Sequence, residues 1–196
     1  MLRELFTKFD QKCQQNKVYK LYTIGDCYVV MGLINIKNRN YIQEAQNGKK
    51  KKIKNIKIQK VINLGFSMIE IIQEVRQIIN YDELDMRIGI HTGNIIGGVV
   101  GTGVVRYDIY GPDVVIANKM ESNGKQSRIM ISENTYQLIY ESCQDIYIFE
   151  DEGEVYISSQ KRKIKTYFIR QQFQYENQQE HNSNISNKYS INKLSI

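Results

Sequence analysis

One acidic residue, Asp26, stands alone in the apolar and aromatic run YTIGDCYVV at residues 22–30. The run predicts two strands, 18–24 and 27–33. Gly25-Asp26 between them is a two-residue hairpin signal, because glycine accepts the positive φ of a tight turn. Such a hairpin would present the Asp26 carboxylate beyond the end of the sheet. The residues alone leave two interpretations open: an aspartate that caps its own turn, or an acid presented for chemistry.

Two other stretches contain residue types that often belong to active sites. His91 lies between two apolar segments, where a packed, hydrogen-bonded histidine is favoured over a base or a metal ligand. The sequence GGVVG at residues 97–101 is rich in glycine but is not a P-loop, since the Gly-Lys-Ser/Thr that must follow is missing. Close packing of a helix against a strand explains these glycines adequately.

The elements that must position these residues follow from hydrophobic spacing. Residues 2–15 have helical spacing with no N-cap before them. A domain rarely starts inside a helix, so we expect the chain to be truncated at its front. The clearest helix is 61–79, with one apolar stripe. The remaining predictions are strand, turn (92–94) and strand over 85–101, helix 113–121, strand 128–131, helix 133–141 with Ser132 as N-cap, and strands near 145–149, 154–158 and 164–170. This order predicts an α+β fold, with helices against an antiparallel or mixed sheet.

The net charge of +6 comes from one segment. Residues 35–60 contain nine Lys or Arg and one acid, Glu44, which gives +8 and leaves 6 − 8 = −2 for the rest. This distribution argues against a nucleic-acid partner. Such a run is typical of a solvated, flexible loop, and contact with anionic lipid or an acidic partner is the alternative.

Other features bound the class of protein. Three cysteines without framework spacing and no signal peptide indicate a reducing, intracellular compartment. No run approaches the roughly 18–20 apolar residues that span a bilayer, although the chain could be part of a membrane protein. We predict one domain at residues 1–170, with the lysine-rich loop 35–60 inserted, and a disordered tail at 171–196 that is rich in Asn, Gln and Ser.

Three stretches in this order resemble the catalytic domain of the class III nucleotidyl cyclases, the adenylyl and guanylyl cyclases. They are KLYTIGDCYVV (20–30), MRIGIHTGNIIGGVVG (86–101) and RYDIYGPDVVIANKMESNGKQSRIMIS (106–132). The first helix and IKTYFIR (164–170) fit as well, so the resemblance covers roughly residues 2–170. It implies a ferredoxin-like core that works as a head-to-tail pair. The implied reaction converts ATP or GTP to the 3′,5′-cyclic nucleotide and pyrophosphate, with two Mg²⁺ or Mn²⁺ ions.

The resemblance also implies roles for single residues. Asp26 matches one of the family's two metal-binding aspartates. The other lies in the family's first strand, which is missing from this chain, so we expect the chain alone to be inactive and the intact gene product to contain that strand upstream. Arg87 matches an arginine that contacts the polyphosphate, with a surface ion pair as the alternative. Asp108 matches a position that reads adenine.

Departures from the family pattern indicate which half of a pair this is. The Asn and Arg that stabilise the transition state are here Val115 and Lys119. Ser158 and Ser159 occupy the place of a phosphate-binding lysine, with Lys161 out of register, and Tyr22 replaces a Lys or Glu that reads the base. The chain therefore resembles the metal-bearing half of a heterodimer-like cyclase. In that half Asp108 faces the degenerate second site, so ATP and GTP both stay open as substrates.

Two functions follow. The first is a half-domain of a cyclase that needs a complementary cyclase domain and acts in cyclic-nucleotide signalling. The second is a non-catalytic cyclase-homology domain that dimerises or regulates. We expect a cytoplasmic location, on the cytoplasmic side of the membrane if the parent protein is membrane-bound.

Overall fold

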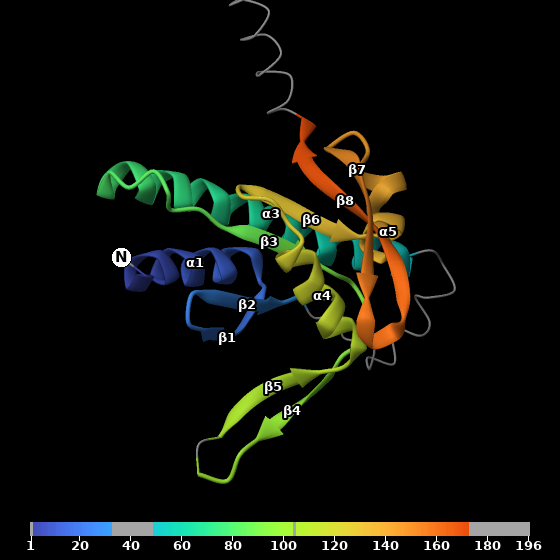
Figure 1. Cartoon of the computed structure of the whole chain (residues 1–196), viewed down its shortest axis with the longest axis horizontal. Helices are drawn as coiled ribbons and strands as arrows, with labels where there is room; N and C mark the ends of the chain where they lie inside the picture. Colours follow the sequence, from blue (N-terminus) through green and yellow to red (C-terminus); the bar gives the residue numbers. More distant parts are fainter. Residues whose placement is uncertain (1, 33–48, 104, 173–196) are drawn as a thin grey trace, which may run out of the picture.

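The computed structural model of the protein describes residues 2–32, 49–103 and 105–172, and for residues 49–54 only the backbone (Figure 1). The helices are α1 (Leu2–Asn16), α3 (Lys49–Ile79), α4 (Pro112–Ser122) and α5 (Glu133–Cys143), with a short 3₁₀ turn at Ser158–Gln160. The strands are β1 (Tyr19–Ile24), β2 (Cys27–Met31), β3 (Arg87–Ile90), β4 (Ile96–Val100), β5 (Arg106–Tyr110), β6 (Arg128–Ser132), β7 (Tyr147–Ile157) and β8 (Arg162–Gln171). The predicted α+β class is confirmed.

The largest sheet has four strands in the order β3-β6-β8-β7. β3 and β6 are parallel and the other two pairs are antiparallel, so the sheet is mixed, as predicted. Successive apolar side chains of β6 point to opposite faces of this sheet, so helices cover both faces. Ile129 and Ile131 pack toward α3 and α5, whereas Met130 packs against Ile116 and Met120 of α4.

The predicted hairpin forms a separate two-stranded sheet. β1 and β2 pair antiparallel with Ile24 opposite Cys27, and Gly25 has the positive φ, 59°, that the turn requires. Its inner side packs with α1 and α3 in a second hydrophobic cluster, to which Tyr28 and Val30 of β2 and Ile88 of β3 contribute. β2 and β3 thus border the same core, yet no pairing between them occurs in the described residues.

β4 and β5 form a third sheet, an arm that projects from the body of the molecule (Figure 1). Within the described ranges the two strands pair with each other and with no further strand, and Gly98 lies opposite Asp108. Large apolar side chains on and beside the arm are exposed: Ile95, Ile96, Val99, Val100, Val105, Tyr107 and Tyr110. Exposed apolar surface that is grouped in this way marks an interaction surface.

Three predictions differ from the structure. The loop predicted at 35–60 is wrong for 49–60, which form the first turns of α3, because lysine is a good helix former and Ile58 continues the buried stripe of Ile62. Residues 35–48 lie outside the described residues, as do residues 173–196 of the predicted tail. The strands predicted near 145–149 and 154–158 are one strand, β7, with a register shift between Asp151 and Gly153. β5 was not predicted.

No helix among the described residues is long and apolar enough to cross a membrane.

Candidate active site

The Asp26 corner is exposed and its supporting hairpin is firmly attached. Tyr28 on β2 packs its ring against Phe6 and Phe9 of α1, with ring centroids 5.4 and 5.3 Å apart. Its hydroxyl donates to Asp10, which also forms an ion pair with Lys20 of β1 at 2.8 Å. Both strands of the hairpin are thus tied to one helix. The Asp26 carboxylate sits at the tip with its side chain in solvent.

Arg87 lies on β3 and is held by Glu121 of α4. The Arg87 Nε donates to Glu121 Oε1 at 3.0 Å, and a terminal nitrogen lies 2.9 Å from the same oxygen. The pair forms because α4 crosses β3 without a side chain between them. A Cβ on Gly89 would lie 2.0 Å from the Glu121 backbone nitrogen. The ion pair left open by the sequence is therefore present, and sequence reasoning missed Glu121.

The carboxylates of Glu121 and Asp26 both affect the pKa of one thiol, that of Cys27. Burial raises the pKa of the Cys27 thiol first, and the carboxylates of Glu121 and Asp26 raise that pKa further. The hairpin tip and the Arg87–Glu121 pair therefore lie within electrostatic range of one another. Among the described residues, no group of three or more His, Cys, Asp or Glu is placed to hold a metal ion. Around the hairpin tip, the described residues present one exposed carboxylate, Asp26, and no complete set of metal ligands.

His91 is packed and hydrogen-bonded, which confirms the interpretation favoured from the sequence. Its side chain is 1% exposed, and Nδ1 lies 2.6 Å from the Ser132 hydroxyl. Ser132 occupies the predicted N-cap position of α5, but its hydroxyl makes no cap bond. The Nε2 of His91 is 3.3 Å from Asp113 Oδ1, and the Asn94 backbone N–H donates to Asp113 Oδ2 at 2.6 Å. The loop before the arm is thus fastened to the first turn of α4.

Asp108 is buried and its carboxylate is already occupied. It accepts from the Ile109 backbone at 2.9 Å, from Arg106 at 2.8 Å and from the Tyr110 hydroxyl at 3.2 Å. The Ile109 N–H lowers the pKa of Asp108, burial opposes this, and Arg106 and Tyr110 lower the pKa further. Tyr22 lies beside this group, since Asp108 contributes to raising its pKa after burial. The structure therefore places side by side Tyr22 and Asp108, the two positions that the resemblance assigns to base reading. Arg106 forms an ion pair with Asp108, and its guanidinium lies 6.0 Å from the centroid of the Tyr22 ring.

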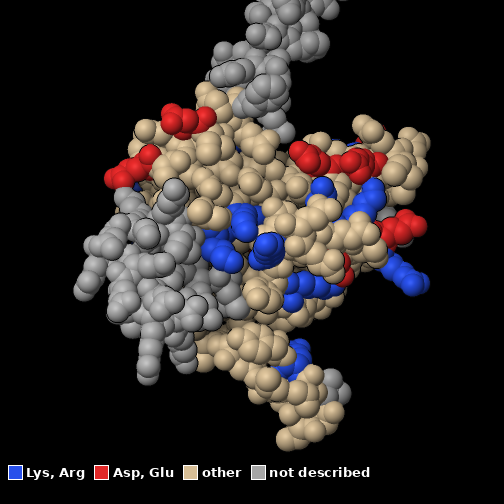
Figure 2. Space-filling model, turned by 180° about the vertical axis from the view of Figure 1, so that it is seen from behind, with Lys and Arg blue, Asp and Glu red and all other residues tan. Residues whose placement is uncertain are grey.

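The two replaced positions on α4 lie one helical turn apart. Val115 is 39% exposed and has no polar group to offer. Lys119 is partly buried on the last turn, and within the described ranges its ammonium has no hydrogen bond or ion pair. At the β7–β8 turn, Lys161 is exposed with φ 48°. Seen from behind, basic side chains spread across the middle of the molecule and acidic ones gather mainly along its upper rim (Figure 2).

Comparison with known proteins gives a family for this arrangement. The model for the adenylate and guanylate cyclase catalytic domain matches residues 1–171. A guanylate cyclase alpha of Plasmodium falciparum (isolate 3D7) is 33% identical over 195 residues, which are 98% of this chain and 4% of that protein. A membrane guanylyl cyclase of Dictyostelium discoideum is 33% identical over 168 residues, 86% of this chain and 10% of that protein.

Solved structures agree on the fold. The guanylate cyclase domain of RhGC from Catenaria anguillulae, solved in complex with GTP, has a TM-score of 0.68 at 24% identity, and the match covers 87% of this chain and 81% of that one. At this identity the likeness shows the fold alone. The chain spans a small part of the curated relatives, 4% of one and 10% of another. The match to the family model and these relatives place the chain in the class III nucleotidyl cyclases, as an adenylate and guanylate cyclase catalytic domain.

Proposed function

We propose that this domain is the metal-bearing half of a two-domain cyclase that converts ATP or GTP to the 3′,5′-cyclic nucleotide and pyrophosphate in intracellular signalling. The observation that carries the proposal is the exposed Asp26 carboxylate on a hairpin fastened to α1 through Tyr28. A carboxylate that only capped its turn would not need such support. A ligand for a metal ion does, since misplacement of about 1 Å can cost roughly 100-fold in rate.

The proposed cofactor is a pair of Mg²⁺ or Mn²⁺ ions, to which Asp26 contributes one hard oxygen ligand. When bound, such ions neutralise charge on the phosphates and make the attacking hydroxyl easier to deprotonate. Because the described residues hold no acidic cluster, the remaining ligands must come from elsewhere. The described residues thus supply one metal ligand, Asp26, and do not by themselves supply enough ligands for two ions.

The split sheet supports a place for the missing ligand. β2 and β3 cover the same hydrophobic cluster through Val30 and Ile88 but do not pair with each other. A strand from outside the described residues could lie between them and pair with both edges. The Asp26 corner directly precedes β2, so an acid at the same level of such a strand would lie next to it. We propose that this strand supplies the second aspartate.

Arg87 is proposed as the polyphosphate contact. Its guanidinium lies at the surface, 47% exposed, and Glu121 holds it in position. Glu121 and Asp26 both act electrostatically on Cys27, which supports a place for Arg87 in the same region as the hairpin tip. A planar guanidinium gives two parallel hydrogen bonds to phosphate oxygens. In this proposal Glu121 orients Arg87 before nucleotide binds.

A complementary cyclase domain is the proposed partner. The β4–β5 arm has no covering element in the described residues, and Ile96 and Val99 are 72% and 68% exposed. The partner would also contribute the transition-state donors, since Val115 cannot donate and Lys119 lacks the planar fork of arginine. Loss of one such donor typically costs roughly 10²–10³ in rate. We therefore propose that neither the isolated chain nor its homodimer is efficient.

The hydrogen bonds that the Asp108 carboxylate already accepts favour the second candidate, a non-catalytic cyclase-homology domain. With Arg106 and Tyr110 on its carboxylate, this position is not free to read a base. In the metal-bearing half the same closure is expected, because the base is read by the partner. The exposed Asp26 supports the enzyme over this second candidate, since a domain that only dimerises has no use for an acid at that tip.

The test is co-expression of the domain, extended by its upstream gene sequence, with candidate partner domains. Cyclic nucleotide is measured from ATP and from GTP with Mn²⁺. We expect activity in one pairing, its loss in Asp26→Ala, and no change in Asp82→Ala, a matched exposed aspartate outside the site. Full activity of Asp26→Ala would refute the metal role.

We further propose that the domain acts on the cytoplasmic side of a membrane protein. The support is the membrane guanylyl cyclase among its relatives. Fractionation of cells that express the full-length protein tests this location: the full-length protein is expected with the membranes, and recovery in the soluble fraction contradicts the proposal.

A further inference from the structure

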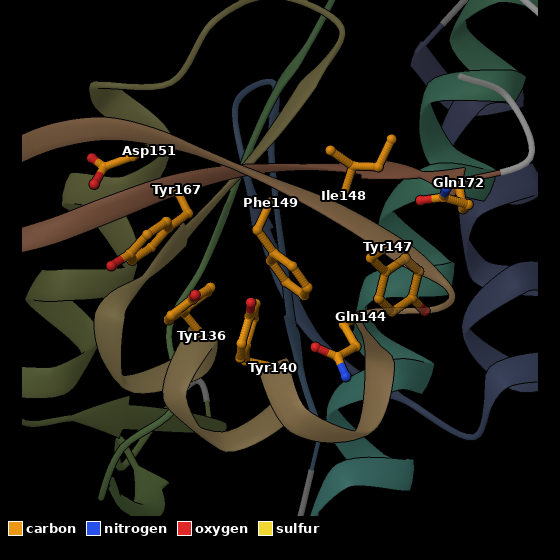
Figure 3. A pocket seen from close by; sticks show the side chains of 9 residues that line it. All are labelled: Tyr136, Tyr140, Gln144, Tyr147, Ile148, Phe149, Asp151, Tyr167 and Gln172. Carbon is orange, nitrogen blue, oxygen red and sulfur yellow. The ribbon is translucent and has the colours of Figure 1, made fainter. Parts of the chain in front are cut away.

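A cavity of about 450 Å³ lies between α5 and the strands β7 and β8, away from the candidate active site. Figure 3 shows aromatic rings from the strands and from α5 pointing toward one another across it. The lining residues are Tyr136, Tyr140, Gln144, Tyr147, Ile148, Phe149, Asp151, Tyr167 and Gln172. None of them belongs to the site around Asp26, and the proposed function leaves this cavity without a use.

The aromatic rings form a well-ordered wall. Tyr136 and Tyr167 are stacked, with centroids 4.0 Å apart and an interplanar angle of 11°. Phe149 meets Tyr136 edge to face at 5.3 Å and Tyr140 at 5.8 Å. The Tyr140 side chain is 41% exposed, so an aromatic surface is available to a ligand. Such rings attract cations to their faces.

Asp151 gives the cavity a negative charge. It pairs with Tyr167 in the β7–β8 ladder and is exposed. The neighbouring acids on β7 are neutralised: Glu150 by Arg128 and Arg170, Glu152 by Lys125 and Glu154 by Lys163. Asp151 accepts only the Gly153 backbone N–H and has no cationic partner within the described ranges. None of the lining residues in the described part of the chain is basic, so the cavity suits an organic cation.

The strand beneath the cavity has a free edge. β7 is the last strand in the order β3-β6-β8-β7, and its outer side has no pairing partner among the described residues. Extended peptides bind such edges by backbone hydrogen bonds, with specificity from alternate side chains. On an added strand, a side chain opposite Phe149 or Asp151 would reach the aromatic wall and the carboxylate together.

We propose that the free edge of β7 and the aromatic cavity form a docking site for an extended segment of another protein that carries an arginine. Arginine suits it because a guanidinium stacks on aromatic rings and pairs with a carboxylate. A protein segment suits it better than a small molecule. The cavity opens to solvent at Tyr140, Gln144 and Asp151, whereas small-ligand sites enclose most of the ligand.

The probe is a fluorescent nine-residue peptide of alternating threonine and valine with a central arginine, titrated into the full chain and followed by polarisation. We expect binding that weakens about tenfold or more when the central residue is glutamate, from charge complementarity. Asp151→Asn should weaken the arginine peptide by about fivefold to tenfold, and Tyr140→Ala should weaken it similarly through the lost ring. Asp82→Asn, in the loop before β3, and Tyr19→Ala, on β1, are exposed controls on other elements and should leave the affinity unchanged.

Two further arms separate the parts of the proposal. A peptide N-methylated at alternate residues cannot pair with the edge and should not bind. Free arginine amide and tetramethylammonium should bind more weakly than the peptide. Equal binding of the arginine and glutamate peptides, affinity unchanged by Asp151→Asn, or free arginine amide binding as tightly as the peptide would each overturn the proposal. If the aromatic wall serves only to pack α5 on the sheet, the arginine peptide will not bind and Tyr140→Ala will lower only the stability of the fold. This result would also overturn the proposal. These measurements need no cyclase activity, so they stand apart from the proposed function.

Discussion

Arg87 and Glu121 are joined across β3 and α4 through a single carboxylate oxygen, at 3.0 Å from the arginine Nε. Both side chains are more than a third exposed, at 47% and 36%, so water screens the pair. We predict that Arg87→Ala and Glu121→Ala each lower the free energy of unfolding by less than about 1 kcal/mol.

Activity should respond differently from stability. In the paired enzyme we expect Arg87→Ala to raise KM or lower kcat strongly while the urea midpoint scarcely moves. The Lys8–Glu74 ion pair, also exposed, provides the control: Lys8→Ala should affect neither quantity by much. A large loss of stability in Arg87→Ala would assign it a structural role instead.

Gly89 should tolerate no side chain. A Cβ there would lie 2.0 Å from the Glu121 nitrogen and 2.6 Å from the Met120 carbonyl carbon. The backbone of α4 would have to move, and overpacking of this kind typically costs about 1–3 kcal/mol or more. Chemical denaturation of Gly89→Ala should show this loss. Gly98→Ala is the matched control on the arm, where nothing lies within 4 Å of an added Cβ, and a comparable loss there would contradict the packing argument.

His91 should make the fold sensitive to mild acid. Burial lowers its pKa below the ordinary 6.5, while Asp113 opposes that shift and Arg162 adds to it. The unfolded chain therefore binds a proton more readily than the folded one. The contribution of His91 is fully present above about pH 6.5 and decreases as the pH falls below that value. Urea unfolding between pH 5 and 8 should show this slope, reduced in His91→Gln. His181→Gln is the control, and an unchanged slope in His91→Gln would count against the assignment.

Asp108 should not select the substrate base. Arg106, Tyr110 and the Ile109 backbone occupy its carboxylate. In the paired enzyme we expect Asp108→Asn to change the ratio of ATP to GTP turnover by less than about threefold, well below the discrimination of a polar base-reading contact. Circular dichroism of the same variant checks that the arm remains folded. A shift of about tenfold or more would place Asp108 at the base.

The sequence was most informative where structure is decided locally. Gly25-Asp26 between two apolar runs predicts a hairpin from turn chemistry alone, and the turn forms as expected. The stripe along residues 61–79 predicts a helix, but its start was missed because four lysines in a row suit a helix and a solvated loop equally. β7 was divided in two because the acids at 150–152 interrupt its alternation. In the structure Glu150 and Glu152 form ion pairs with Arg128 and Lys125, and the pairing with β8 continues through this stretch with one register shift.

The residues of the candidate site stay a prediction, whereas their contacts are seen in the structure and could not be predicted. Asp26, Arg87 and Asp108 could be named from matching motifs. The pairing of Arg87 with Glu121 depends on how closely α4 crosses β3 at Gly89, which only tertiary packing determines. The ion pair between Arg106 and Asp108 depends on β5, which contains both residues. Its sequence has no strong strand pattern, so this contact was not predicted. The cavity beside α5 joins residues from three elements, so no single stretch of sequence indicated it.

The separation of the hairpin from the four-stranded sheet has a dynamic consequence. The hairpin packs on the rest of the molecule through side chains such as Tyr28 and Val30, and in the described part of the chain it forms no backbone ladder with β3. Its amides can therefore exchange with solvent deuterium through a local opening that leaves the larger sheet intact. We expect two protection levels in hydrogen exchange, a lower one for β1 and β2 and a higher one for β6 and β8. Insertion of a strand beside β2 would merge them into a single cooperative unit.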